Sequence, residues 1–141
     1  MSGVRSLLRL DAVPVQNDLA LLLLRVWFGL SLAGLHGFMK IGWLSADPVQ
    51  FADPFGLGPT VSLALAAGAE VVGALLVVIG LATRWAALAV MVTMATAFFS
   101  AHGAKLQGEG NGELPFLFFA AFLVIFLAGP GRFSADAKLG Q

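Results

Sequence analysis

Five ionisable side chains stand out because they lie within, or at the ends of, long apolar segments. They are His36, Lys40, Glu70, His102 and Glu113. In such surroundings, histidine, lysine and glutamate are the side chains that commonly exchange protons or hold polar ligands. If the five face one another, they form a pocket that can bind a quinone headgroup or a small anion and move protons. Their positions alone assign no catalytic residue.

The sequence excludes several other kinds of chemistry. It contains no cysteine, which rules out disulfides, a thiol–disulfide relay carried by this chain, covalent c-type haem and cysteine-ligated clusters. No zinc spacing, nucleophile triad, phosphate-binding loop or dinucleotide fingerprint is present, so we expect no metal site. Haem b held by His36 and His102 is a weaker hypothesis, because Lys40 is an unfavourable neighbour for an added cation.

The composition is that of a membrane protein. Of the 141 residues, 59% are hydrophobic and only 11% are charged, whereas soluble domains carry about 25% charged residues. Eight basic residues balance eight acidic ones, so nothing in the charge predicts a nucleic-acid partner. We therefore expect the lipid membrane to be the main surroundings of the chain.

Four apolar segments predict four transmembrane helices within one domain that covers residues 1–141. The expected spans are approximately 19–40, 60–82, 84–102 and 113–129. About 20 residues cross the hydrocarbon core, so the last two spans need flanking residues or local thinning of the bilayer. The segments lack the alternation of strands. The predicted fold class is therefore all-α, an integral membrane four-helix bundle.

Basic residues predict the orientation of this bundle. If the N-terminus is cytoplasmic, the cytoplasmic side holds five basic residues and the opposite side holds two: Arg5, Arg9, Arg84, Arg132 and Lys138 against Lys40 and Lys105. By the positive-inside rule, both termini are then cytoplasmic. The N-terminal stretch has no apolar run before Pro14. We expect it to be an interfacial helix or a disordered leader, and not a cleavable signal peptide.

One stripe of the first predicted helix carries all of its charged side chains. At 100° per residue, its members fall within about 80° of one another; they are Arg25, Gly29, Ala33, His36 and Lys40. Such a stripe should face the bundle interior. Counting helical rises places Arg25 and Glu70 within about 8 Å in depth, which predicts a structural ion pair. Two alternatives stay open, a protonatable or ligand-contacting Glu70 and a neutral Glu70.

The remaining candidates should meet near the outer surface. We expect His36, Lys40, His102 and Glu113 to share one depth, with Glu70 below them. The alternative is that they are helix-end residues that touch water, with Glu113 favourable at a helix N-terminus. On the face of the last helix opposite Glu113, four aromatic side chains are expected to meet lipid or a partner subunit: Phe118, Phe119, Phe122 and Phe126.

Four pieces of the sequence resemble the DoxX family of small four-helix membrane proteins. They are LHGFMKIGW (Leu35–Trp43), AEVVGALLVVIGLATRWAAL (Ala69–Leu88), His102, and GNGELPFLFFAAFLVIFLAGPGRFSAD (Gly110–Asp136). The family is named for the membrane subunits of a thiosulfate:quinone oxidoreductase, and other members are linked to oxidative-stress and thiol homeostasis beside soluble redox enzymes. The resemblance implies a multi-pass protein of a bacterial-type inner membrane that is quinone-linked and part of a larger assembly. It supplies no list of catalytic residues.

Three functions remain after the sequence is read. In the first, the chain is at most the membrane subunit of a quinone-linked oxidoreductase: His36 and His102 bind quinone oxygens, Lys40 stabilises negative charge, and Glu70 or Glu113 relays protons. In the second, the polar groups only lock the bundle, and the chain is a non-catalytic scaffold subunit. In the third, it is a small transporter or proton pathway, although no broken span or repeat supports this.

Overall fold

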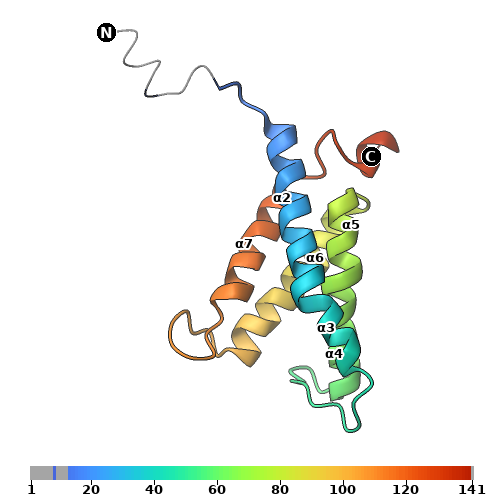
Figure 1. The fold of residues 1–141 in the computed structure, drawn as a ribbon, viewed down its shortest axis with the longest axis vertical. Coiled ribbons are helices and arrows are strands. Elements are labelled where there is room, and N and C mark those ends of the chain that lie inside the picture. The colour runs from blue at the N-terminus through green and yellow to red at the C-terminus, as the bar shows by residue number, and fades with distance from the viewer. Residues whose placement is uncertain (1–7, 9–12, 141) are drawn as a thin grey trace.

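The computed structural model of the protein describes residue 8 and residues 13–140. Within these residues, the secondary structure consists of helices joined by loops, with no strand. The first helical stretch runs from Asn17 to Trp43, the second from Pro59 to Ile79 and the third from Thr83 to Ala101. Their parts are α2 (Asn17–Leu32), η1 (Ala33–Gly37) and α3 (Phe38–Trp43); α4 (Pro59–Gly68), η2 (Ala69–Gly73) and α5 (Ala74–Ile79); and α6 (Thr83–Thr96) and η3 (Ala97–Ala101). Two helices follow, α7 (Glu113–Ala128) and α8 (Ala135–Lys138) (Figure 1). The predicted N-terminal helix or leader lies largely outside the described residues.

The first three stretches are long and apolar enough to cross a membrane. Helix α7 is also apolar but has only 16 residues, which span about 24 Å at the helical rise. The hydrocarbon core is about 30 Å thick, so α7 needs adjoining residues or a thinner bilayer to cross it. The prediction of an all-helical membrane bundle is confirmed at this level.

Glycine and proline set the ends of the helices. Gly80 ends α5 in the left-handed conformation, with φ of 72°, which costs little without a Cβ atom. Pro59 occupies the first turn of α4, where its missing N–H is no loss. Gly129, with φ of 84°, ends α7 and precedes Pro130. The stop at Gly80 keeps the connection between α5 and α6 short.

The first two helical stretches pack closely through two glycines of the first. A Cβ atom on Gly29 would lie 2.9 Å from the carbonyl oxygen of Ala74, and one on Gly37 would lie 2.9 Å from that of Glu70. Contacts this close between backbones are typical of helices in membranes. They fix the register, because Gly37 of η1 lies level with Glu70 of η2.

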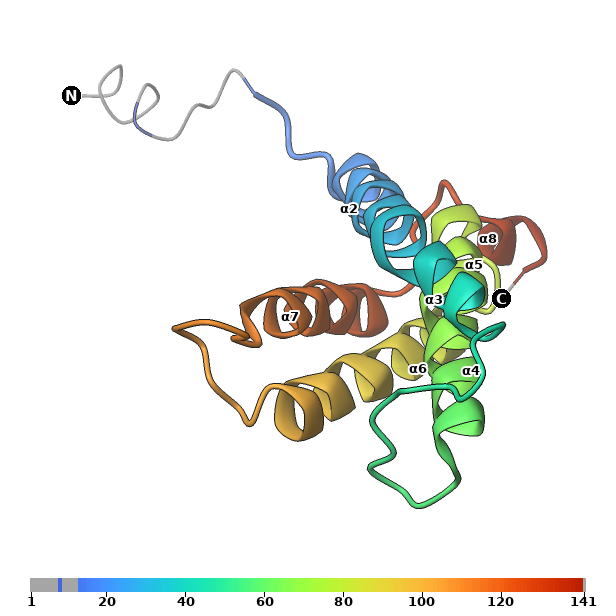
Figure 2. The same cartoon turned by 60° about the horizontal axis from the view of Figure 1, so that its bottom comes forward.

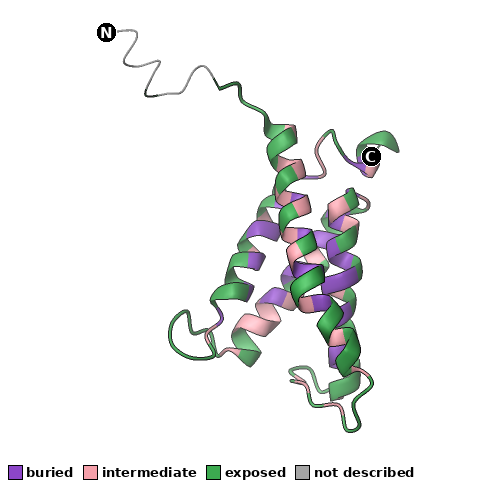
Figure 3. Ribbon diagram, in the orientation of Figure 1, coloured by how far each residue is buried: buried purple, intermediate pink, exposed green. Residues whose placement is uncertain are grey.

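Helix α7 packs mainly against α6, beside which it runs (Figure 2). The prediction that its phenylalanines face lipid or a partner subunit was wrong for Phe118 and Phe122. Phe118 and Phe122 are buried in the core, and Phe119 and Phe126 pack against it (Figure 3). The rings belong to the same core cluster as several small side chains of α6, namely Ala86, Ala87 and Val90. The small residues leave space that the large rings fill.

The C-terminal segment binds the start of α6 and the buried Arg25 of α2. The Asp136 carboxylate accepts hydrogen bonds from the backbone N–H groups of Ala82 (2.7 Å) and Thr83 (2.9 Å) and from the Thr83 hydroxyl (2.7 Å). It thereby caps the N-terminus of α6, which has no cap of its own. The buried Arg25 of α2 donates to the carbonyl oxygen of Phe133. Without these contacts, the α6 terminus and the Arg25 guanidinium would lack partners.

The start of α2 and the C-terminal segment lie at the same end of the bundle (Figure 1). The backbone N–H of Arg132 donates to Asp18 Oδ1 at 2.9 Å. The connections Leu44–Gly58 and His102–Gly112, which we call the first loop and the third loop, lie at the opposite end.

Candidate functional site

The centre of the candidate site is an ion pair between the first two helical stretches. Lys40 Nζ of α3 lies 2.6 Å from Glu70 Oε2 of η2. The side chains are 16% and 5% exposed, so both charges are largely removed from water. A buried charge is tolerated when it is paired and hydrogen-bonded. This pair is therefore the main polar feature inside the apolar bundle.

The predicted ion pair between Arg25 and Glu70 is not the one that forms. Glu70 binds Lys40, while Arg25 donates to the Phe133 carbonyl at the far end of the bundle. The close contacts of Gly37 place Glu70 level with that glycine, which is 12 residues, or about 18 Å, along the helix from Arg25. Because α2 begins beyond the end of α5, counting from the two helix ends underestimated the difference in depth.

Each of the first three helical stretches contains one π-helical turn, and each such turn borders the site. Turn η1 contains His36, η2 contains Glu70, and η3 ends beside His102. In each turn a backbone N–H reaches five residues back, as from Phe38 to Ala33 and from His102 to Ala97. Such turns change the direction of the side chains that follow and are frequent at functional sites. The hydrophobic pattern does not predict these turns.

A cavity of about 290 Å³ lies on one side of the ion pair and is bordered by four of the five residues singled out in the sequence. We call it the small cavity. Its polar lining is His36, Lys40, Glu70, His102 and Asn111, and its apolar lining is Leu32, Met94, Ala97, Leu114, Pro115 and Phe118. The structure thus places the two histidines beside the Lys40–Glu70 pair, within one cavity.

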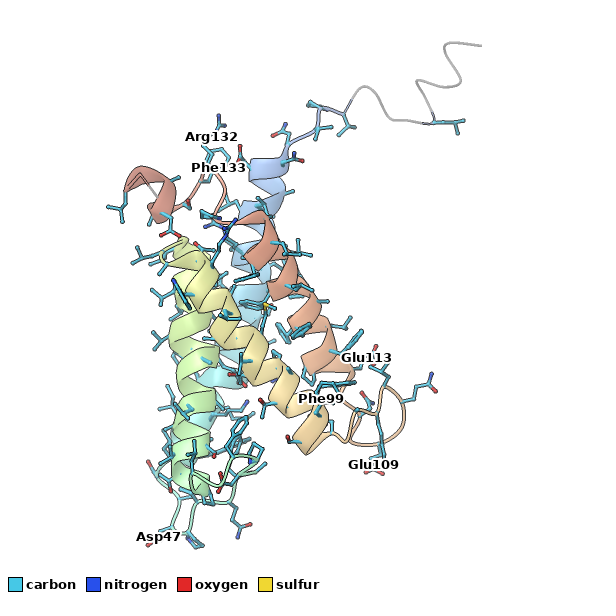
Figure 4. All side chains as sticks on the ribbon, turned by 180° about the vertical axis from the view of Figure 1, so that it is seen from behind. Asp47, Phe99, Glu109, Glu113, Arg132 and Phe133 are labelled. Carbon is cyan, nitrogen blue, oxygen red and sulfur yellow. The ribbon has the colours of Figure 1, made fainter. Side chains whose placement is uncertain are left out.

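Glu113 does not belong to this cavity. Its side chain is exposed at the start of α7, near Glu109 of the third loop (Figure 4). The residue that reaches the cavity instead is Asn111, whose side chain accepts from the Glu113 N–H at 3.0 Å and donates to the Gly108 carbonyl at 2.7 Å. An asparagine in a glycine-rich loop is common in ordinary turns, so the sequence offered little reason to select it.

A hydrogen bond to the third loop fixes the hydrogen on the His102 ring. Its Nδ1 lies 2.8 Å from the carbonyl oxygen of Gly110. A carbonyl oxygen only accepts, so Nδ1 carries the hydrogen and the Nε2 of the neutral ring is an acceptor. His36 lies in a different setting, with its ring edge-on to Phe118 at 5.8 Å between centroids. The two histidines therefore differ in how firmly the protein orients them.

A second, larger cavity lies on the other side of the ion pair. Its volume is about 520 Å³, and it runs between α4–η2 and α6–η3. We call it the large cavity. Along α6 and η3 its lining extends from Ala89 to Ala101, about 18 Å by helical rise. Both cavities border Lys40, Glu70, Ala97 and His102. The ion pair and His102 therefore form the boundary between a mainly apolar space and a more polar one.

The large cavity is bordered by exposed apolar side chains of two helices and by residues of the first loop. Leu65 of α4 and Val92 of α6 line it, and both are more than half exposed. Phe51, Pro54 and Phe55 of the first loop also contribute to the lining. An opening between two helices at membrane depth would admit molecules from the bilayer.

Asp53 holds the first loop in place. Its carboxylate accepts hydrogen bonds from Ser62 Oγ (2.7 Å), the Gly58 N–H (2.8 Å) and the Leu57 N–H (2.9 Å). The Ser62 hydrogen bond, followed by the bond from the Gly58 N–H, holds the pKa of Asp53 below its usual value. The loop is thereby fastened to α4, next to the large cavity.

No cluster of three or more His, Asp or Glu side chains that could hold a metal ion occurs in the described part of the chain. The site contains an ammonium group, a carboxylate, two imidazoles and an amide beside the mainly apolar large cavity. Such groups can bind a polar headgroup, stabilise charge and exchange protons.

The chain resembles known proteins over most of its length. The DoxX family model matches residues 20–103. One protein of Haemophilus influenzae is 26% identical over 131 residues, covering 89% of this chain and 86% of the relative. Another is 33% identical over 112 residues, covering 74% of this chain and 79% of the relative. Both relatives are uncharacterized proteins, and no solved structure matches the chain. The family model covers more than half of the chain, including the Lys40–Glu70 pair and most of the first three helical stretches. The chain therefore belongs to the DoxX family.

Proposed function

We propose that this protein is a quinone-binding membrane subunit of a larger redox assembly. The observation that carries the proposal is the large cavity, an apolar channel that opens toward lipid and ends at the buried Lys40–Glu70 pair. A quinone has the matching shape and chemistry, since its apolar tail carries a headgroup with two carbonyl acceptors. Binding sites for such ligands are typically apolar with a few well-placed polar groups.

The residues at the inner end of the channel fit a quinone headgroup. Lys40 and a protonated His102 are donors for carbonyl oxygens, while Glu70 is an acceptor for a quinol hydroxyl. A bound quinone would supply reversible two-electron, two-proton chemistry. Lys40 would stabilise negative charge on the headgroup oxygen. His102 would exchange protons at Nε2 while the Gly110 carbonyl keeps its ring oriented.

The electron donor in this proposal is a partner. The connections among residues 13–140 are short, and the longest are the first and third loops. We see in them no fold that could hold an electron carrier, and the chain has no cysteine. The assembly would lie in a bacterial-type inner membrane with both termini of this chain cytoplasmic, as the distribution of basic residues predicts.

The proposal is tested by blocking the channel without touching its polar end. Val92 lines the large cavity and is 54% exposed, while Val124 of α7 lines neither cavity and is 51% exposed. We expect Val92→Trp to weaken binding of decylubiquinone to the protein in lipid nanodiscs at least tenfold. Val124→Trp adds the same side chain to a lipid-facing position and should leave the affinity unchanged.

The same measurement decides against the proposal if the unaltered protein binds no decylubiquinone. If the large cavity instead holds an ordinary lipid acyl chain, a spin-labelled phospholipid should bind to the unaltered protein. Other phospholipids should then displace the spin-labelled lipid, and decylubiquinone should not. Absence of quinone binding, with recovery of the protein in a large complex, would favour the scaffold function.

A further inference from the structure

The small cavity has the features of a space that holds water. Five polar side chains line it, from η1, α3, η2, the end of η3 and the third loop. A water molecule occupies about 30 Å³ and requires two to four polar partners. A cavity of about 290 Å³ has room for several water molecules, and its lining gives them partners. An apolar cavity of equal size would stay dry.

The position of the small cavity connects the site with one aqueous side of the membrane. Asn111 belongs to the third loop, whose residues 103–110 are all exposed. At the inner end, the same cavity reaches Lys40, Glu70 and His102, which also border the large cavity. The site thus has two approaches, one from lipid between α4 and α6 and one from the third-loop side.

We propose that the small cavity is a water-filled entrance that joins the Lys40–Glu70 pair to the aqueous phase on the third-loop side. Its ligands are water and the protons that water carries. The ionisable groups that face it are His36, Lys40, Glu70 and His102, while Glu113 lies outside at the surface. This entrance gives protons a route to the site that does not pass through the large cavity. The role of the entrance in proton exchange rests on the proposed quinone-binding function.

The physical need for such a route follows from the burial of the ion pair. Protons do not cross hydrocarbon readily, since a charge in that medium is strongly unfavourable. A ligand that arrives through the large cavity brings no water with it. His102 lies where both cavities meet, and Gly110 of the third loop fixes its ring. In this proposal, His102 is therefore a group through which protons would be exchanged where the two cavities meet.

The absence of cysteine from the chain allows a direct test with single-cysteine variants. Met91 and Met94 lie one turn apart on α6 and are both buried, but Met94 lines the small cavity and Met91 lines neither cavity. The probe is sulfonatoethyl methanethiosulfonate, a charged, water-soluble thiol reagent that needs access through water. In proteoliposomes, we expect Met94→Cys to react at least tenfold faster than Met91→Cys.

A second pair keeps the test valid if a methionine variant fails to fold. Leu32 lines the small cavity and the adjacent Ala33 does not, although both are buried. Leu32→Cys should react and Ala33→Cys should not. The fraction of Met94→Cys labelled from outside the vesicle should equal the fraction of Gly103→Cys, which lies in the third loop. Gly140→Cys lies at the opposite end of the bundle, so its labelled fraction and that of Met94→Cys should add up to the whole protein population.

Equal reactivity within both pairs, or labelling of Met94→Cys from the side of Gly140, would overturn the water-filled entrance. The experiment contains no quinone, so its outcome is independent of decylubiquinone binding. Labelling without quinone binding would leave the entrance established and remove the proposed function. Quinone binding without labelling would support the proposed function and overturn the water-filled entrance.

Discussion

At the scale of single residues, the Lys40–Glu70 pair is both the chemical centre of the site and a demand on the stability of the fold. The two charges lie 2.6 Å apart and are largely shielded from water. Each therefore depends on the other, because an uncompensated charge in an apolar interior is far more costly than a pair. By contrast, the Arg132–Asp18 contact at 3.9 Å is largely exposed.

Removing one member of the pair should destabilise the protein. We expect Lys40→Met to lower the free energy of unfolding by about 3–5 kcal/mol, the range for breaking a buried pair. Lys40→Met/Glu70→Gln should restore a large part of the loss, because no lone charge remains. Thermal unfolding in detergent measures both effects. Arg132→Met is the control and should change stability by less than about 1 kcal/mol.

A double variant no more stable than Lys40→Met would contradict the conclusion that the two charges depend on each other.

The ion pair could be predicted from the sequence only in part. Lys40 and Glu70 were each recognised as polar residues inside apolar segments, but their partnership was not. The partner of Glu70 depends on how far one helix slides along another, and Gly29 and Gly37 determine that register through backbone contacts.

At the scale of elements, the end of one helix is completed by a distant part of the chain. Helix α6 begins at Thr83 without a capping side chain of its own, and Asp136 supplies the acceptors that its first N–H groups need. The carboxylate also lies at the positive end of the helix dipole, which favours negative charge. The position of α6, and with it the wall shared by both cavities, therefore depends on the C-terminal segment.

We expect Asp136→Asn to lower the free energy of unfolding by about 1–2 kcal/mol, the range for loss of a helix cap. Burial acts to raise the pKa of Asp136, but hydrogen bonds from Thr83 and Ala82 and the charge of Arg25 hold it below its usual value. A lowered pKa in the folded state means that this stabilisation is complete above the ordinary pKa of an aspartate, about 3.9. It is lost as the pH falls through the lower, folded value.

The measurement is thermal unfolding of the unaltered protein and of Asp136→Asn between pH 3 and pH 7. The difference between them should be largest near neutral pH and should shrink in acid. Asp47→Asn is a matched control, since this aspartate is exposed in the first loop. A difference that is independent of pH would show that the carboxylate charge plays no part in the cap.

The elements also show where sequence reasoning reaches its limit. Apolar length predicted the all-α class. The π-helical turns were not predicted, because the residues within them, such as Ala33, Ala69 and Ala97, are equally suited to an ordinary α-helix. The inward direction of the α7 phenylalanines was also missed, since it depends on the small side chains of α6 that they meet.

At the scale of the whole molecule, the two ends of the bundle have different roles. One end holds the start of α2 and the C-terminal segment, and the other holds the two longer loops, with the candidate site between the helices nearby. The structure places α2's start and α8 on one side, and the basic residues predict that this side is cytoplasmic.

This orientation is tested in intact cells with a membrane-impermeant maleimide. Ser45→Cys in the first loop should be labelled from outside, whereas Gly140→Cys should be labelled only after the membrane is opened. Both residues are exposed, so a difference between them reports the side of the membrane. Labelling of Gly140→Cys in intact cells would reverse the orientation and place the small cavity on the cytoplasmic side.

The opening of the large cavity toward lipid has a consequence for how tightly a ligand must bind. Leu65 and Val92 border that opening, so an apolar ligand reaches the cavity without passing through water. Occupancy follows the ratio of ligand concentration to dissociation constant, and the concentration that counts is the mole fraction in the bilayer. A membrane-soluble compound is concentrated there by partitioning. Even a site with modest intrinsic affinity would then be filled, while still releasing its ligand fast enough for repeated exchange.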